Sequence, residues 1–375
     1  MLGGDGLTEL NVSNWNTSNV TNLFGTFQDC SNLVELNVSN FDTSKVTICG
    51  HTGWGYGGTF QGCSSLEKLD ISNWDVSQAT DISNMFCNCS KLTKLDVSRW
   101  DTSKVTSLYN LFCDCTSLKD LDVSGFNTSK VTNMQEIFRS CKELMVLDLG
   151  SWDTSEVTNM QNMFWNCIGL TKLDISNFDT GNVTNIAQMF FNCSGLIELN
   201  INSFDTSQVT NMGAMFQNCR RLTELNINSF DTSQVTNMRC MFYNCASLRK
   251  LNIGKFNTNE VTTMDQMFTS CGELTELDIS GFNTNKVNNM SYMFNGNRKL
   301  KTIYVSEYNE ENKTGWTTSN VTSSTNMFAG CQVITGGNGT TYNSNNIDAT
   351  YARIDTEETP GYFTNIKDKP TDAEQ

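Results

Sequence analysis

The chain has 375 residues, with 25 basic and 40 acidic side chains and a formal net charge of −15. Nucleic-acid and anionic membrane surfaces are both recognised through clustered Lys and Arg, and the sequence has no such cluster, which argues against both partner classes. No stretch approaches the ~20 apolar residues of a membrane helix, so we expect no membrane insertion by this chain. Cationic partners, divalent ions and neutral ligands remain open.

A cysteine column fixes the organisation of the chain. Cysteine recurs every 26 residues at Cys63, Cys89, Cys115, Cys141, Cys167, Cys193, Cys219, Cys245 and Cys271. Cys30 precedes this run by one period plus seven residues, Asn297 occupies the next slot, and Cys331 follows after an insertion of eight, which makes twelve copies. Repeats of this kind contact only their neighbours, so the sequence predicts a solenoid.

The first half of each copy has the period of a strand. In the copy that begins at Cys89, the residues Leu92, Leu95 and Val97 have the spacing L-x-x-L-x-V, and apolar and polar residues alternate over 95–98. Alternation with period two predicts a short strand with one buried face. An aromatic residue then closes the strand, and an Asp-Thr-Ser turn follows. Since one copy is too small to fold alone, the strands must stack as one parallel sheet.

The second half of each copy has the period of a helix. Apolar residues fall at i, i+3, i+4, i+7 and i+10, as at Met134, Ile137, Phe138, Cys141 and Leu144. Thr132 stands just before them, where a hydroxyl can cap the first helical turn. We therefore expect an α/β repeat solenoid, with a parallel β-sheet on the concave face and short helices on the convex face.

The repeat frame divides the chain into four parts. We expect a partial first repeat at 1–29, the repeat array at 30–331, a capping segment at 332–364 and a linker-like tail at 365–375, with insertions near 48–58 and 304–315. The first residues read as the middle of a repeat and carry neither the basic nor the apolar part of a signal peptide. We therefore expect the signal and the anchor to lie outside this chain, with further coding sequence on at least one side.

The pattern L-x-x-L-x-[VIL] is the strand signature of leucine-rich repeats. The string LTKLDISNFDTGNVTNIAQMFFNCSGL, which starts at Leu170, and the ending YARIDTEETPGYFT, which starts at Tyr351, resemble the BspA-like leucine-rich-repeat surface proteins of bacteria and some protists. The resemblance covers residues 7–364 and implies an extracellular, anchored surface protein that binds host or neighbouring cells. One slot departs from better-known leucine-rich repeats, because an aromatic residue replaces the usual Asn or Cys at Trp74, Trp100, Phe126, Trp152 and Phe178.

An acidic column is the first candidate site. It is formed by Asp70, Asp96, Asp122, Asp148 and Asp174, which we expect to project from the concave sheet in successive coils. Such a polar stripe suits a cation-rich or carbohydrate ligand. The alternative interpretation is a solvated face that the repeat has copied, partly neutralised by neighbouring lysines.

The insertion at 48–58 is the second candidate site. It holds the only histidine, His51, together with Trp54 and Tyr56, whose rings could stack on a sugar or anchor a protein. Irregular insertions on a regular scaffold often carry function. A tolerated surface loop is the alternative interpretation.

The cysteine column sits on the apolar face, so we interpret its thiols as buried small hydrophobes, too far apart on neighbouring helices for disulfides. Outside the column, Cys87 and Cys113 share one slot of adjacent copies and are candidates for a disulfide. The spacing of the cysteines does not favour a zinc site, and we predict no metal and no cofactor.

Catalysis finds little support in the sequence, because the lone histidine has no evident partner and no nucleotide-binding or metalloprotease motif occurs. We expect a non-catalytic adhesion or recognition module whose partner is a protein or glycan of a host or neighbouring cell. The alternative is a structural spacer in a surface layer, sheath or virion appendage. The slot before the second leucine varies between copies, as at Lys94, Asp120 and Val146, which favours recognition.

Overall fold

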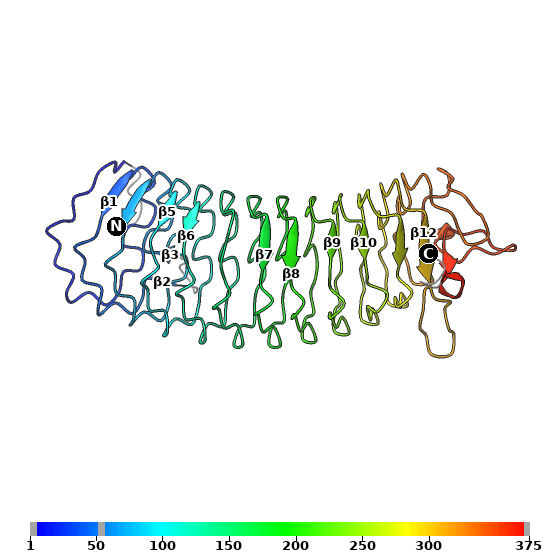
Figure 1. The fold of residues 1–375 in the computed structure, drawn as a ribbon, viewed down its shortest axis with the longest axis horizontal. Coiled ribbons are helices and arrows are strands. Elements are labelled where there is room, and N and C mark those ends of the chain that lie inside the picture. The colour runs from blue at the N-terminus through cyan, green and yellow to red at the C-terminus, as the bar shows by residue number, and fades with distance from the viewer. Residues whose placement is uncertain (1–5, 52–56, 371–375) are drawn as a thin grey trace. The chain divides into compact units, whose positions relative to one another are not determined.

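The computed structural model describes residues 6–51 and 57–370, which form two compact units. The first unit contains the chain up to Val183 together with Met189–Leu196, and the second contains Thr184–Gln188 together with the chain from Ile197 onward. Within each unit, successive coils lie side by side, and short strands follow one another along one side of the stack (Figure 1).

The predicted parallel strands are present within both units. In the first unit β1 pairs with β4 and β5 with β6, and in the second β9 pairs with β10, while β11, β12 and β13 form one sheet; all these pairs are parallel. The strands are β1 (Glu35–Asn37), β4 (Lys68–Asp70), β5 (Lys94–Leu95), β6 (Asp120–Leu121), β7 (Lys172–Asp174), β8 (Glu198–Asn200), β9 (Glu224–Leu225), β10 (Lys250–Leu251), β11 (Glu276–Asp278), β12 (Thr302–Val305) and β13 (Thr364–Asn365). In the register of β1 and β4, Leu36 lies beside Leu69, so equivalent positions of the repeat are stacked directly.

A second ladder runs along each unit on the turn side of the coils. It consists of isolated parallel bridges, such as Asp81 with Ser107 and Ser107 with Asn133 in the first unit, and Asn211 with Asn237 in the second. Each coil is therefore held to its neighbour at two places, once at the strand and once at the start of the turn segment.

The turn segment is not the helix that the sequence predicts, and that prediction was wrong. The helical segments in the described residues are the short 3₁₀ turns η1 (Ala349–Tyr351) and η2 (Ile366–Asp368). In the regular coils, alternate N–H groups donate to the next coil, as Leu108 does to the Asn133 carbonyl at 3.0 Å. The N–H groups between them donate three residues back, as Leu111 does to Leu108 at 3.2 Å. An α-helix needs each of these donors for its own i−4 carbonyl.

Residues with left-handed backbone conformation recur in the turn segment and allow the chain to form these consecutive turns. The residue before the column cysteine has positive φ in coil after coil, for example 61° at Asn88, 61° at Asn166 and 63° at Asn218. Asparagine tolerates this region better than most residues. The positions expected on a helical face, such as Met134, are buried all the same, because consecutive turns return the chain to the core at similar intervals.

Threonine does not cap a helix here, which corrects a second prediction. The Thr132 hydroxyl donates to the Thr106 carbonyl of the preceding coil at 3.3 Å. A different, buried threonine column forms a tighter link: the Thr102 hydroxyl donates to the Asn127 carbonyl at 2.9 Å and accepts the Asn127 N–H at 2.8 Å. These hydroxyls bond coil to coil rather than within one coil.

Two aromatic columns fill the core. The column that closes the strands is stacked, with ring centroids of Trp100 and Phe126 6.4 Å apart and those of Phe126 and Trp152 likewise 6.4 Å. A phenylalanine column in the turn segment is packed more closely, at 5.8 Å between Phe86 and Phe112. Because both columns are buried, they define a single apolar interior within each unit.

Both insertions contain an antiparallel pairing and leave the coil intact. At 48–58, β2 (Gly50–His51) pairs antiparallel with β3 (Gly57–Gly58), and beyond the hairpin the Thr59 N–H donates to the Cys49 carbonyl at 2.9 Å. This bond replaces the turn bond of a regular coil. At 304–315, Asn309 and Thr314 form an antiparallel bridge, and the loop projects beyond the neighbouring coils of its unit (Figure 1).

The segment after Cys331 covers the end of the core in the second unit. The Tyr362 and Phe363 rings contact Phe328 at centroid distances of 5.1 and 5.8 Å. The Asp355 carboxylate organises this segment by accepting the backbone N–H of Asn338 at 2.9 Å and several further donors. The ladder of strands then ends at β13, so the apolar column is covered at this end.

Candidate recognition surface

The predicted acidic column lies on the exposed face of the strands in the first unit. Its five aspartates are all exposed. Each carboxylate also has a local role, because the Asp96 Oδ1 atom accepts the Ser98 N–H at 3.2 Å and the Ser98 hydroxyl at 2.8 Å. The same bonds form at Asp70 and Asp122. The column therefore turns the chain after each strand while its side chains stay exposed.

These hydrogen bonds also stabilise the negative charge. The Ser98 hydroxyl and N–H hold the pKa of Asp96 below its usual range, and the Ser124 hydroxyl and N–H do the same for Asp122. Hydrogen bonds to an ionised carboxylate favour that form. These two carboxylates are consequently ionised at neutral pH.

The neighbouring slot on the same face carries side chains of both signs. We call the residues just before the second leucine of each copy the outer strand column. In this column the Lys68 ammonium lies 3.2 Å from the Glu35 carboxylate and the Lys94 ammonium 3.1 Å from that of Asp120. Further along, Val146 is 76% exposed, an unusual exposure for an apolar side chain within a charged column. The scaffold repeats, but its outer strand column differs from coil to coil.

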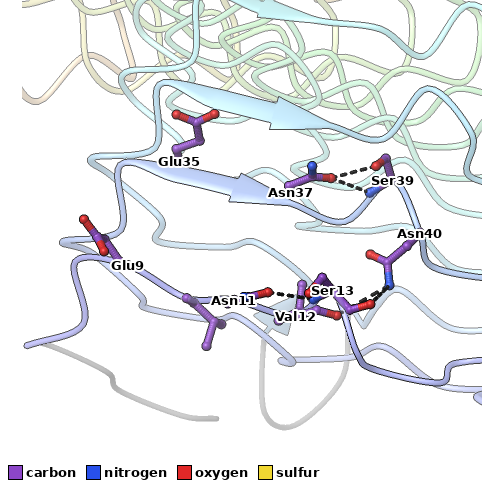
Figure 2. Close-up of a pocket in the computed structure, with 9 residues that line it drawn as sticks. Glu9, Asn11, Val12, Ser13, Glu35, Asn37, Ser39 and Asn40 are labelled. Atoms are coloured by element: carbon purple, nitrogen blue, oxygen red, sulfur yellow. Dashed lines mark hydrogen bonds between the residues drawn. The ribbon is translucent and has the colours of Figure 1, made fainter.

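An open groove follows the strand face at the beginning of the first unit. One hollow of about 620 Å³ is lined by Glu9, Glu35, Asn37 and Asn40 among others, and a second of about 590 Å³ by Glu35, Asn37, Asp70, Asp96 and their neighbours. The two hollows share Glu35 and Asn37, so they adjoin each other along the strand face. Figure 2 shows Glu9 and Glu35 projecting from successive coils, with Asn37 and Asn40 beside the turns. The Asn40 amide donates to the Ser13 carbonyl at 3.2 Å and fixes this wall of the groove.

The inserted loop is separate from this groove. His51 packs edge-on against Phe24, at 6.2 Å between ring centroids, and its Nδ1 atom lies 3.8 Å from the Asp81 carboxylate. The Asn84 amide donates to the His51 carbonyl at 3.1 Å. All these partners belong to the turn side of the coils. Trp54 and Tyr56, the other predicted loop residues, lie outside the described residues. The structure thus does not bring His51 together with the aspartate column.

The cysteine column is buried, as predicted, but its thiols are more than small hydrophobes. The Cys89 Sγ atom donates to the Phe60 carbonyl at 3.1 Å, and Cys167 does the same to Phe138 at 2.9 Å. Asn297, which replaces cysteine in one coil, uses its amide for the equivalent bond to Phe268 at 2.8 Å. The slot therefore selects a hydrogen-bond donor.

The sequence analysis explained the absence of disulfides in the cysteine column by the distance between neighbouring helices, and that explanation was wrong. Neighbouring coils are bonded backbone to backbone, so separation between helices does not keep these thiols apart. Burial raises the pKa of Cys193 to about 12 and that of Cys271 likewise to about 12, while the carbonyl bonds hold their sulfur atoms in place. Inaccessible, protonated thiols of this kind are inert.

One further column was recognised from the sequence only at Cys87 and Cys113. We call the residues two positions before the column cysteines the outer turn column. In the first unit it carries Cys87, Cys113, Arg139, Trp165 and Phe191. The Arg139 guanidinium lies 5.0 Å from the centroid of the Trp165 ring, which stacks on Phe191 at 5.3 Å. The sequence could have indicated the whole column, because many other copies carry a polar residue in this slot and these five copies differ from them.

The residues that the structure describes lack two features of other protein classes. Over residues 6–51 and 57–370, no group of three or more His, Cys, Asp or Glu side chains is arranged to hold a metal ion. Within the same residues, no helix has the length and apolar character of a membrane span.

Comparison with protein families identifies the repeat. The model described as "Mycoplasma protein of unknown function, DUF285" matches residues 3–52, 56–169, 141–250, 166–275 and 219–339. The chain belongs to the DUF285 family. The successive DUF285 matches overlap, as expected when one repeated unit can be placed in several registers. No curated protein matches the sequence.

Solved structures give distant alignments to this DUF285 chain. A TLR13–ssRNA13 complex aligns at 16% identity with a TM-score of 0.27, over 73% of this chain and 49% of that one. The functional domain of InlJ from Listeria monocytogenes, whose description includes a cysteine ladder, aligns at 17% identity and a TM-score of 0.19, over 76% and 61%. The plant peptide hormone receptor RGFR1 in complex with RGF2 aligns at 13% identity and a TM-score of 0.19, over 78% and 62%. The chain thus spans less than two thirds of each, and the fold assignment rests on the coils described above.

Proposed function

We propose that this chain is a non-catalytic recognition module of the extracellular cell surface, similar to BspA-like proteins, which binds a protein or glycan on the exposed strand face of its first unit. The observation that carries the proposal is the groove from Glu9 to Asp96, where variable charges stand on an otherwise repeated scaffold. Residues that serve only to stack coils have no physical reason to differ in sign from one coil to the next.

The charge of this face favours a cationic protein segment as the partner. Four of the groove's carboxylates, those of Glu9, Glu67, Asp70 and Asp96, have no lysine within ion-pairing distance in the described structure, and the chain as a whole carries −15. Complementary potentials steer association and fix register, and they weaken with salt. Binding should therefore fall as ionic strength rises.

A pair of matched variants tests the surface. The strand-face variant carries Asp→Asn at Asp70, Asp96, Asp148 and Asp174. Asparagine keeps the turn, because the Asn37 side chain already accepts the Ser39 N–H at 3.0 Å in an equivalent position. The control variant carries Asp→Asn at Asp75, Asp101, Asp153 and Asp179, which lie in the same four coils and accept N–H bonds of the same kind, but follow the aromatic residue that closes each strand. Of the eight aspartates, Asp70 and Asp96 line the groove.

Binding is measured by interferometry on the immobilised full chain, against arrays of basic, acidic and neutral peptides and of glycans. Four exposed charges at ~0.3–0.5 kcal/mol each give about 1–2 kcal/mol, or roughly a tenfold weaker Kd for the strand-face variant. The control variant should bind its basic peptides as the parent chain does. Equal weakening by both variants would show that net charge alone matters and would refute the surface.

The inserted loop is a second candidate contact on the turn side. A Trp54→Ala/Tyr56→Ala variant that loses binding while the strand-face variant retains it would move the site to the loop. Absence of any hit on either array would favour the alternative of a structural spacer, because a spacer needs no partner along its length.

A further inference from the structure

Two thiols of the outer turn column lie in adjacent coils of the first unit. Cys87 is half-buried and Cys113 is 1% exposed, and both are free thiols. Their backbones are in direct contact, because the Asn88 N–H donates to the Cys113 carbonyl at 2.7 Å. Parallel neighbours of this kind are about 4.8 Å apart, which lies within the Cα separation of about 4.4–6.8 Å that a disulfide requires.

Charged groups surround the second thiol. The Cys113 sulfur lies 3.3 Å from the Asp114 carboxylate and 3.8 Å from the Arg139 guanidinium. A hydrogen bond with Cys87, burial and the Asp114 charge all raise the pKa of Cys113, while Arg139 lowers it. Cys113 is therefore the partner that keeps its proton, and the more exposed Cys87 is the thiol that an external reagent meets first.

We propose that Cys87 and Cys113 form a dithiol modification site that low-molecular-weight disulfides oxidise to a bond between adjacent coils. In the first step the Cys87 thiolate attacks a sulfur of the small disulfide, and one small thiolate leaves. In the second step Cys113 loses its proton to solvent, beside the positive charge of Arg139, and attacks the Cys87 sulfur, which releases the second small thiolate. Two protein S–H bonds are replaced by one S–S bond, and the small disulfide is reduced to two thiols.

The column cysteines do not take part in this reaction, although they too occupy equivalent positions in adjacent coils. Cys89 and Cys115 are fully buried, and each sulfur is held by a carbonyl of the preceding coil, at 3.1 Å in both cases. An attacking disulfide cannot reach them without opening the coil. The cross-link is thus expected at one pair only within the described structure.

The experiment uses the full chain in buffers of defined glutathione to glutathione disulfide ratio. Free thiols are then alkylated under denaturing, non-reducing conditions, and peptides are sequenced by mass spectrometry to locate linked cysteines. The parent chain should lose the label at both Cys87 and Cys113 and yield a peptide pair joined between them. Cys113→Ser should instead accumulate a glutathione adduct at Cys87, whereas Cys87→Ser should leave Cys113 unmodified. The control Cys240→Ser removes a thiol that lies beside Arg239 but has Ala214 and Gln266 in the adjacent copies, and it should behave as the parent does.

The outcome on the parent chain decides the matter even if a variant fails to fold. A glutathione adduct that persists at Cys87 in the parent would show that Cys113 does not resolve it, and a link through Cys89 or Cys115 would show that the column opens. Either result overturns the proposal. Neither depends on whether the strand face binds a partner.

Discussion

Replacing Asn297 tests why cysteine recurs along this chain. Asn297 is fully buried, its amide nitrogen donates to the Phe268 carbonyl at 2.8 Å, and its Oδ1 atom has no partner among the described residues. A buried polar atom without a partner costs about 1–3 kcal/mol, and a thiol is a weaker donor than an amide by a fraction of that. Asn297→Cys should therefore stabilise the second unit by about 1 kcal/mol.

Asn297→Val is the discriminating comparison. Valine also removes the orphan oxygen, but it leaves the Phe268 carbonyl without a donor, so it should be at least ~1 kcal/mol less stable than the cysteine variant. Long repeat arrays do not always unfold in one step, so the measurement is the urea midpoint together with amide exchange at residues of the neighbouring coils. If valine stabilises as much as cysteine, hydrogen bonding is irrelevant to this slot and the small-hydrophobe interpretation is restored.

Three further predictions follow from other contacts. Thr102→Val should cost about 2–4 kcal/mol, because both backbone bonds of its hydroxyl to the next coil are lost, whereas the exposed Thr106→Val should cost less than about 1 kcal/mol; urea unfolding compares them. The Lys369–Asp278 pair, 2.7 Å apart, should hold the C-terminal segment against limited proteolysis between about pH 4 and 10, and Lys369→Met should abolish that window. Burial raises the pKa of Cys193 to about 12, so iodoacetamide should leave this thiol unlabelled at pH 8 until the chain is denatured.

The pKa shifts of Asp278 and Lys369 determine the two ends of the pH range in which their ion pair stabilises the C-terminal segment. Burial alone raises the pKa of Asp278, but the hydrogen bonds from Lys369 and Ser280 outweigh it and leave the pKa lowered, so the stabilisation is lost as pH falls through that lowered value. Burial alone lowers the pKa of Lys369, but the bond to Asp278 outweighs it and leaves the pKa raised, so the stabilisation is lost as pH rises through the raised value. Resistance to protease that does not change from pH 3 to 7 would contradict this account.

The strands were predictable from the sequence and the turn segments were not. Leu36 and Leu69 occupy the same position of successive copies. An alternation of buried and exposed side chains with period two fits few structures other than a strand. In the turn segment, the spacing of Met134 and its neighbours fits a helix and a chain of turns equally well, since both return a side chain to the core every three or four residues. What separates them is the destination of the backbone donors, and periodicity carries no information about that.

A local signal for turns was nevertheless present. The slot before the column cysteine holds Asn, Asp, Ser or Gly throughout, for example at Asn88, Asp114 and Gly296, and each of these has positive φ. Helix interiors select against such residues, while left-handed positions select for them. A column of these types inside a predicted helix is therefore evidence for turns, even where the apolar spacing is helical.

The candidate sites show a different limit. In a repeated chain, a residue that recurs is explained by stacking, as the Cys167 thiol is by the Phe138 carbonyl and the Asp96 carboxylate by the Ser98 N–H. Recurrence at the aspartate column is thus weak evidence for a ligand, because the turn already accounts for it. Function must be sought where a slot changes its chemistry while the backbone does not. By that criterion the outer strand column and the outer turn column are the informative ones, and only the structure, which places Cys113 against Arg139, shows that the changes within a column touch one another.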